Sequence, residues 1–148
     1  MSKASEVPFE TTLFVRDACL CLHLQRAARA LARRFDEAFR PLGLTSGQYS
    51  LMMSLNRPEP PSIGSVASLL AMDRTTLTAA LKPLQRRRLV MVVIDADDRR
   101  SRRLKLTGAG RALLVRAVPV WRRTHAEIEK GLPRAGADRL RRDLLALT

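Results

Sequence analysis

The pattern of apolar and polar positions predicts a helix that begins after Asp73. Leucines recur there at the helical spacing i, i+4, i+7, at Leu77, Leu81 and Leu84, which gives one buried stripe. Asp73 is suited to cap the first turn. The opposite face carries short hydroxyls and cations, groups that contact base edges and phosphates in nucleic-acid complexes: Arg74, Thr75, Thr76, Thr78 and Lys82.

After this helix the period of the pattern shortens to two. Residues 89–94 form a β-branched apolar run, residues 95–100 are a charged turn, and Leu104 and Leu106 then alternate with cations. This pattern predicts a β-hairpin with a basic tip. A helix that exposes hydroxyls and cations, followed directly by such a hairpin, is typical of a winged helix-turn-helix, in which the helix enters the major groove and the wing lies along the neighbouring minor groove.

Helical patterns also precede and follow this segment. Residues 13–39 predict one long helix, ended by Pro41 and Gly43, whose apolar stripe is too long for one small core to cover. Residues 45–48 form a capping box that opens a second helix, and Ser62 opens a short third one. Thr107 caps a helix that Pro119 should bend, and residues 137–147 form a last amphipathic helix.

Charge is distributed unevenly over the 148 residues. The net charge is +13, and residues 73–111 carry 11 basic and 4 acidic groups, a net of +7 in about a quarter of the chain. This predicts a polyanionic partner at the helix and hairpin, and the alternative is a solvated basic surface. A hydrophobic content of 46% excludes a disordered chain. No apolar run is long enough for a membrane span and no signal peptide opens the sequence, so we expect a cytoplasmic protein without membrane contact.

The hairpin segment resembles a known family. DADDRRSRRLKLTGAG is similar to the wing signature of MarR-family bacterial transcriptional regulators, D-P-x-D-R-R followed by L-T-x-x-G. The matching positions are Asp95, Asp98, Arg99, Arg100, Leu106, Thr107 and Gly110, with Ala96 in place of the usual proline. The preceding helix is similar to the family's recognition helix. One departure is Arg88, where the family usually has glycine, and a positive φ there would cost arginine about 1 kcal/mol.

The resemblance implies a mainly α fold with a small β-hairpin wing, in which the first and last two helices interlock with those of a second subunit. It divides the chain into a flexible N-terminal tail (1–10), a dimerisation helix (11–40), a winged helix-turn-helix domain (41–107) and C-terminal dimerisation helices (108–148). A two-fold dimer reads a near-palindromic site with half-sites about one helical turn apart.

Individual roles follow from the resemblance and from side-chain chemistry. The resemblance places Arg100 in the minor groove, with Asp98 holding the wing tip in shape; the alternative is a surface ion pair between the two, worth less than about 1 kcal/mol. Arg74, Thr75, Thr76 and Thr78 are candidates for base contacts. Cations expected at phosphates are Lys82, Arg86, Arg99 and Arg102. Ser62 and Ser65 are further phosphate candidates, although helix capping explains Ser62 equally well.

Two roles are open for the cysteines: redox sensing, or ordinary packing in the core. On a continuous helix Cys19 and Cys21 would point about 200° apart and could not form a disulfide. Cys21 is expected on the buried face, and it aligns with the reactive cysteine of the family's organic-hydroperoxide-sensing branch. Where that branch has tyrosines, this chain has Gln25, Phe35 and Ser46. A buried cysteine without polar partners has a raised pKa and is inert.

Regulation by a small aromatic ligand is the other route that the resemblance implies. Its pocket would lie between the DNA-binding lobe and the dimer helices, at His23, Tyr49, Met52, Met53 and Trp121, residues that also suit an ordinary core. We expect no cofactor and no metal, because the two histidines have no companion carboxylates at ligand spacing.

The sequence and the resemblance therefore predict a sequence-specific transcriptional regulator, a repressor that acts as a homodimer on a near-palindromic operator and is released by a small ligand or an oxidant. A non-specific nucleoid-type DNA-binding protein is the alternative, since it shares the charge but has no need of a wing. An enzyme is disfavoured, because the chain has no nucleophile elbow, no phosphate-binding loop and no cysteine with a neighbouring base.

Overall fold

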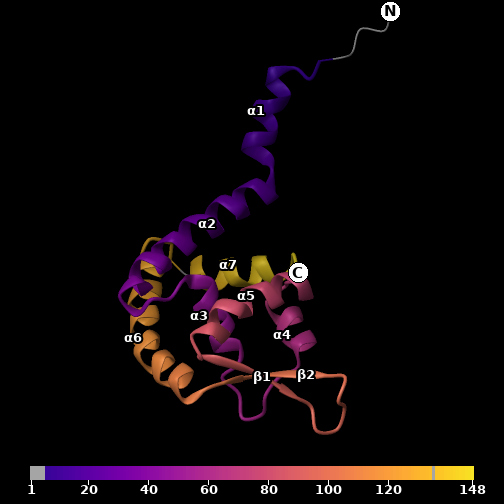
Figure 1. Cartoon of the computed structure of the whole chain (residues 1–148). Coiled ribbons are helices and arrows are strands. Elements are labelled where there is room, and N and C mark those ends of the chain that lie inside the picture. Colours follow the sequence, from indigo (N-terminus) through magenta and orange to yellow (C-terminus); the bar gives the residue numbers. More distant parts are fainter. Residues whose placement is uncertain (1–5, 135) are drawn as a thin grey trace, which may run out of the picture.

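A computed structural model describes residues 6–134 and 136–148 of the chain (Figure 1). Its elements are α1 (Phe9–Ala18), α2 (Leu20–Phe39), the 3-10 turn η1 (Arg40–Leu42), α3 (Ser46–Ser54), α4 (Ile63–Leu69), α5 (Arg74–Arg86), β1 (Val90–Ile94), β2 (Arg102–Leu106), α6 (Gly108–Lys130) and α7 (Gly136–Leu145). The prediction of a mainly α fold with a β-hairpin wing is confirmed.

The core lies where α3, α4, α5 and the hairpin meet α6. The predicted stripe on α5 is buried, with Leu77, Leu81 and Leu84 at most 2% exposed, and it packs with Leu104 and Leu106 of β2. The capping box is present at Thr45, whose hydroxyl accepts the N–H of Gln48 while its own N–H donates to the Gln48 side chain. Burial of the leucine stripe leaves the opposite, polar face of α5 in solvent.

The hairpin is antiparallel, and hydrogen bonds join it to the residues that come just before α4. Val90 pairs with Leu106 and Ile94 with Arg102. The N–H of Leu104 donates to the carbonyl of Pro61 (2.9 Å), and Ser62 forms an isolated bridge with Arg103. Because these bonds join β2 to the chain just before α4, the wing is fixed relative to the helix-turn-helix.

The Arg103 side chain also joins the wing to the turn before α4. Its Nε donates to Asp95 Oδ2 at 2.8 Å, and its Nη1 donates to the carbonyl of Pro60 at 2.8 Å. One guanidinium therefore links both ends of the hairpin tip to the proline-rich turn. The N–H of Asp97 and the Arg103 guanidinium hold the pKa of Asp95 below its ordinary value.

The N-terminal helix differs from the sequence prediction. Residues 13–39 were expected to form one helix, but the chain is extended at Cys19 (φ −69°, ψ 109°), which separates α1 from α2. The break is stabilised locally because the Cys19 Sγ accepts the N–H of Leu22 (3.5 Å) and so caps α2. Helix α1 begins at Phe9, inside the segment 1–10 expected to be a tail, and projects away from the rest of the chain (Figure 1). Residues 1–5 of that tail lie outside the described residues.

Arg88 has a positive φ (57°), so of the two possibilities at this position, a different turn or a strained arginine, the structure has the second. Arg88 ends the turn after α5 in a left-handed conformation that costs a non-glycine residue about 1 kcal/mol or more. Neither proline within a helix ends it: Pro83 lies inside α5 and Pro119 inside α6, which arcs along one side of the molecule (Figure 1).

The terminal helices bury none of their residues in the single chain. Helices α1 and α7 have no buried position, and large apolar side chains on α1, α2 and α7 are 37–71% exposed, among them Phe9, Phe14, Leu20, Leu24, Leu31, Leu140, Leu144 and Leu145. Among the described residues, no helix combines the length and apolar character required to cross a membrane.

Replacing Gly110 with Ala is expected to destabilise the fold by about 1–3 kcal/mol, because a Cβ there would lie 2.2 Å from the carbonyl oxygen of Leu89. Gly108→Ala, two residues earlier in the same helix, is the matched control, since a Cβ at that position meets nothing within 4 Å. Urea unfolding of both variants measures the difference. Equal stability of the two variants would contradict the close packing of α6 on Leu89.

Asp95→Asn is expected to lower stability at neutral pH and to matter less in acid. The pKa of Asp95 is lowered in the folded chain, so its contribution is present above about pH 4 and is lost as pH falls through the folded value. Urea unfolding between pH 3 and 7 should therefore show the gap between the two proteins narrowing below about pH 4. Asp97→Asn is the control for a nearby charge change. If the difference in the free energy of unfolding between the two proteins stayed constant with pH, the ionised Asp95 carboxylate would not be the stabilising group.

Candidate nucleic-acid interface

The exposed face of α5 begins at a capped N-terminus. Asp73 accepts the N–H of Thr76 (2.7 Å) and the Thr76 hydroxyl (2.9 Å), and these bonds lower the pKa of Asp73. The Thr76 hydroxyl proton is therefore used within the cap. Sequence reasoning had grouped Thr76 with the base-contact candidates without this second role.

The other candidates on α5 project into solvent. Arg74, Thr75, Thr78, Lys82 and Arg86 are all exposed. The Thr78 hydroxyl donates to the carbonyl of Arg74 at 2.8 Å, which fixes its rotamer and leaves its oxygen free to accept. The helix thus presents cations and an oriented hydroxyl on the face opposite its buried leucines.

One hollow of about 300 Å³ brings together the start of α4, the start of α5 and the wing. Five of the twelve predicted DNA-contact residues line it: Ser62, Arg74, Thr78, Arg100 and Arg102. The remaining lining residues are Ile63, Gly64 and Ser101. Three guanidinium groups from two elements therefore surround one space, a charge arrangement suited to a phosphate-bearing ligand.

Gly64 is a residue that sequence reasoning missed. A Cβ at Gly64 would lie 3.0 Å from an Nη atom of Arg74, so the glycine lets the guanidinium pass close to the backbone of α4. The only sequence signal is a glycine inside a short helix, where helix propensity alone disfavours it.

The wing tip is shaped by Asp98. Its Oδ1 accepts the N–H of Arg100 (3.0 Å), and its carbonyl accepts the N–H of Ser101 (2.9 Å). The carboxylate therefore bonds the backbone of the turn, and no ion pair joins the Asp98 and Arg100 side chains among the described residues. The Arg100 side chain remains exposed at the tip.

The other wing cations have different surroundings. Arg99 is exposed, and Arg102 Nη1 donates to the carbonyl of Arg99 at 2.8 Å, which holds Arg102 across the turn. Arg103, which sequence reasoning left out, is the clamp to Asp95 and Pro60. Arg103 pairs with Val93, so Asp95 lies diagonal to it, two positions further along the strand and within reach of a long side chain.

Ser62 and Ser65 are joined to each other. Ser62 caps α4 by accepting the N–H of Ser65 (3.1 Å), and the Ser65 hydroxyl donates to the carbonyl of Ser62 (3.0 Å). The capping alternative for Ser62 is therefore present in the structure. Capping leaves lone pairs on both hydroxyl oxygens but no free donor on Ser65.

The five residues expected to line a ligand pocket lie in different surroundings. Tyr49 and Met52 are core residues, with the Tyr49 ring stacked on Phe39 at 4.7 Å between centroids. Met53 is exposed, Trp121 is half-buried and stacks on His125, and His23 lines an arginine-rich hollow on α2. A pocket that includes all five remains a prediction.

The cysteine geometry differs from the sequence prediction. Cys21 is exposed in the single chain rather than buried, and its Sγ accepts Nε2–H of Gln25 at 3.3 Å. Cys19 is not part of a helix, so the argument that the two side chains point about 200° apart does not hold. Both thiols are free.

Comparisons with known proteins agree with this architecture. The MarR family model matches residues 44–101. The Mycobacterium tuberculosis transcriptional regulator MosR, in complex with DNA, is 38% identical; the match covers 87% of this chain and 92% of that one, with a TM-score of 0.80. BpsR of Bordetella bronchiseptica, solved in work on the regulation of its DNA binding by 6-hydroxynicotinic acid, is 25% identical, with 88% and 93% coverage and a TM-score of 0.78.

A curated relative gives the same family with a shorter match. The transcriptional activatory protein BadR of Rhodopseudomonas palustris is 33% identical over 113 residues, which are 74% of this chain. The chain spans about two thirds of the length of that relative, 65%. These relatives are transcriptional regulators and not enzymes. With its capped recognition helix, its clamped arginine-tipped wing and these likenesses, the chain belongs to the MarR family of transcriptional regulators.

Proposed function

We propose that the protein binds double-stranded DNA in a sequence-specific manner, as a homodimer, and represses the gene it occupies. The observation that carries this proposal is the hollow shared by α4, α5 and the wing, where Arg74, Arg100 and Arg102 surround one space. Arginines from a helix and from a hairpin that is hydrogen-bonded to the residues before α4 allow simultaneous contact with two grooves. The DNA complex of MosR, which is 38% identical, supports DNA binding by this chain.

The individual contacts follow from exposure and remaining hydrogen-bond capacity. Arg74, Thr75 and Thr78 are proposed to contact base edges, with Thr76 in the cap as a fourth candidate. Arg100 is proposed to enter the minor groove, since Asp98 holds its backbone and leaves its guanidinium free. The residues proposed at phosphates are Ser62, Ser65, Lys82, Arg86, Arg99 and Arg102.

The homodimer is supported by the apolar faces that the single chain leaves open. Leu24 and Leu31 of α2 are 37% and 38% exposed, and Leu140 and Leu144 of α7 are 43% and 37% exposed. Apolar stripes on helices at both ends of the chain are suited to cover each other in a second copy. A two-fold dimer would place two recognition helices about one helical turn apart on a near-palindromic operator.

Arg100→Ala is expected to weaken operator binding by about 1–3 kcal/mol without unfolding the protein, because it removes a specific groove contact. Lys82→Ala, which removes one positive charge from an exposed position of α5, is the matched control. It should weaken all DNA sequences equally and reduce the slope of log affinity against log salt by about one. Fluorescence anisotropy with operator and random duplexes measures both, and its stoichiometry of two chains per operator tests the dimer.

Each outcome has a distinct meaning. Unchanged operator affinity for Arg100→Ala would remove Arg100 from the minor groove. Equal affinity of the unmodified protein for operator and random DNA would replace sequence-specific regulation by a nucleoid-type function. Expression of a reporter gene placed behind the operator distinguishes repression from activation. A rise in expression when the protein binds would contradict repression and agree with the name of the relative BadR, a transcriptional activatory protein.

Release from DNA is proposed to follow binding of a small aromatic ligand or oxidation by an organic hydroperoxide. The effect of 6-hydroxynicotinic acid on DNA binding of BpsR supports the first route. The predicted ligand residues are His23, Tyr49, Met52, Met53 and Trp121. The second route uses Cys21, whose exposed thiol would reduce the hydroperoxide to an alcohol and become a sulfenic acid.

Cys21→Ser separates the two routes. If Cys21 is the sensor, a stoichiometric organic hydroperoxide should release the unmodified protein from operator DNA, and the variant should stay bound. Cys19→Ser is the control for the neighbouring thiol. Anisotropy of labelled operator follows the release, and a complex that ignores the oxidant would leave the aromatic ligand as the signal.

A further inference from the structure

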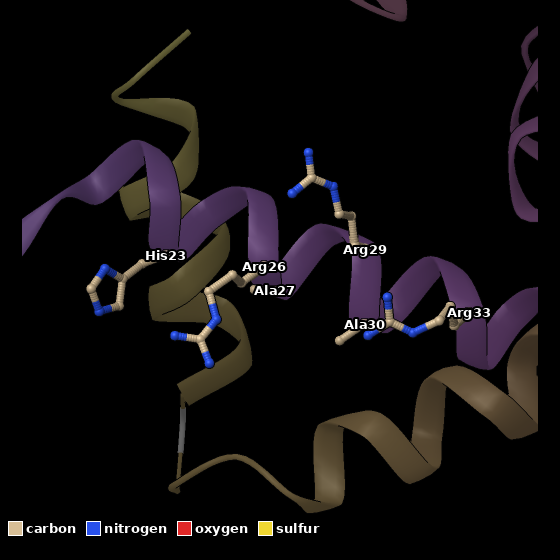
Figure 2. A pocket seen from close by; sticks show the side chains of 6 residues that line it. All are labelled: His23, Arg26, Ala27, Arg29, Ala30 and Arg33. Atoms are coloured by element: carbon tan, nitrogen blue, oxygen red, sulfur yellow. The ribbon is translucent and has the colours of Figure 1, made fainter. Parts of the chain in front are cut away.

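A row of arginines lies on α2, away from the interface described above. His23, Arg26, Ala27, Arg29, Ala30 and Arg33 line a hollow of about 530 Å³ on this helix (Figure 2). Arg33 extends back along α2 over Ala30, Arg26 projects beside Ala27, and Arg29 projects from the other edge (Figure 2). The small alanines form the floor, so a ligand could reach the helix surface between the guanidinium groups.

Among the described residues these arginines have no carboxylate partner, as is also true of Arg34 on α2 and of Arg116 and Arg123 on α6; what distinguishes them is that they line one hollow. In the described part of the chain Arg26, Arg29 and Arg33 make no ion pair, whereas Arg16, Arg40, Arg139 and Arg141 each have a carboxylate within 4.0 Å. Like charges three and four residues apart on a helix destabilise it. An anion that bridges them removes this repulsion.

The hollow continues toward α6. A second hollow of about 530 Å³ shares Ala30 and Arg33 and is lined on its far side by Thr124 and Glu127. Glu127 does not neutralise the row, because Lys130 Nζ lies 2.7 Å from its carboxylate and, with Arg34, lowers the pKa of Glu127. Glu37 also lines the second hollow, and its carboxylate pairs with Arg40. We call the two hollows, which share Ala30 and Arg33, one groove, and both carboxylates of the second hollow are already paired with cations.

The row also lies outside the apolar face proposed for dimer contact. Leu24, Leu31 and Phe35 share one side of α2, and Arg26 and Arg33 fall on the opposite side at the helical period. A second copy seated on the leucines would therefore meet the side of α2 opposite Arg26 and Arg33.

We propose that this groove on α2 binds a small anion with several phosphate charges, as the effector site of the regulator proposed above. Arg26 and Arg33 are seven residues apart, about 10 Å along the helix axis, a span that a single carboxylate does not bridge and a chain of phosphates does. Guanidinium groups bind phosphate oxygens with two parallel hydrogen bonds. The apolar floor at Ala27 and Ala30 would take the organic part of such an effector.

The test uses the full chain and inorganic tripolyphosphate, measured by calorimetry without DNA. Arg26→Gln/Arg33→Gln is expected to weaken tripolyphosphate binding about tenfold or more. The matched control is Arg116→Gln/Arg123→Gln, which removes two exposed arginines at the same seven-residue spacing on α6 and should retain the affinity. Equal binding by all three proteins would assign the anion to the DNA surface and overturn the proposal.

Operator binding distinguishes this inference from the proposed function. The Arg26/Arg33 variant should bind operator DNA with unchanged affinity, and tripolyphosphate should shift operator affinity of the unmodified protein more than that of the variant. A uniform loss of DNA affinity in the variant would make the row a DNA contact instead and overturn the proposal. Failure of specific operator binding by the unmodified protein, with tripolyphosphate binding intact, would overturn the proposed function and leave the anion site standing.

Discussion

The junction between the wing and α6 fixes how the DNA-binding part meets the outer helices. Thr107 caps α6 by accepting the N–H of Gly110 (3.0 Å), and its hydroxyl donates to the carbonyl of Arg88 (2.7 Å). Its own N–H donates to the carbonyl of Leu89 (3.1 Å), the atom against which Gly110 packs. One threonine therefore joins the end of α5, both strands and the start of the longest helix.

This junction gives a physical reason for several positions of the wing signature. Thr107 is needed as both donor and acceptor, and Gly110 is needed because no Cβ fits against Leu89. The positive φ of Arg88 turns its carbonyl toward Thr107, and that hydrogen bond helps to stabilise a conformation that arginine adopts at a cost. The turn found in relatives with glycine is therefore retained here.

The sequence predicted the parts of the fold that depend on local periodicity and capping. The leucine stripe of α5, the Asp73 cap and the hairpin all followed from residues within a few positions of one another. The break at Cys19 did not, because good helix formers continue through it and a thiol is a weak cap that propensity does not predict. The exposure of Cys21 has a different cause: it lies on the same face of α2 as Leu24 and Leu31, and the single chain leaves that face open.

The residue types of the candidate site could be predicted from the sequence, but the role of each side chain could be predicted less well. Exposed cations and hydroxyls on α5 and the wing could be named from the sequence, but which of them are already hydrogen-bonded within the chain could not. Thr76 and Arg103 show the difference: one hydroxyl completes a cap and one guanidinium clamps the wing to Pro60. The bond between Arg103 and Pro60 joins residues 43 positions apart, which no local pattern encodes, whereas the bond between Thr76 and Asp73 spans three positions and is part of the cap.

Arginines of the chain gather on two surfaces, one at α5 and the wing and the other on α2. On α5 and the wing, anchored arginines line a hollow beside the recognition helix, where a rigid arrangement favours specific contacts over mere attraction. On α2, unpaired arginines lie on a helix that also carries an apolar stripe and packs against α6. Because α6 starts at the Thr107 junction, a ligand that moved α2 against α6 would act on the helix that sets the position of the wing. The junction is therefore one covalent and hydrogen-bonded route by which an event at the outer helices can reach the DNA-binding surface, beside the direct bond of the Ser46 N–H in α3 to Asp36 in α2.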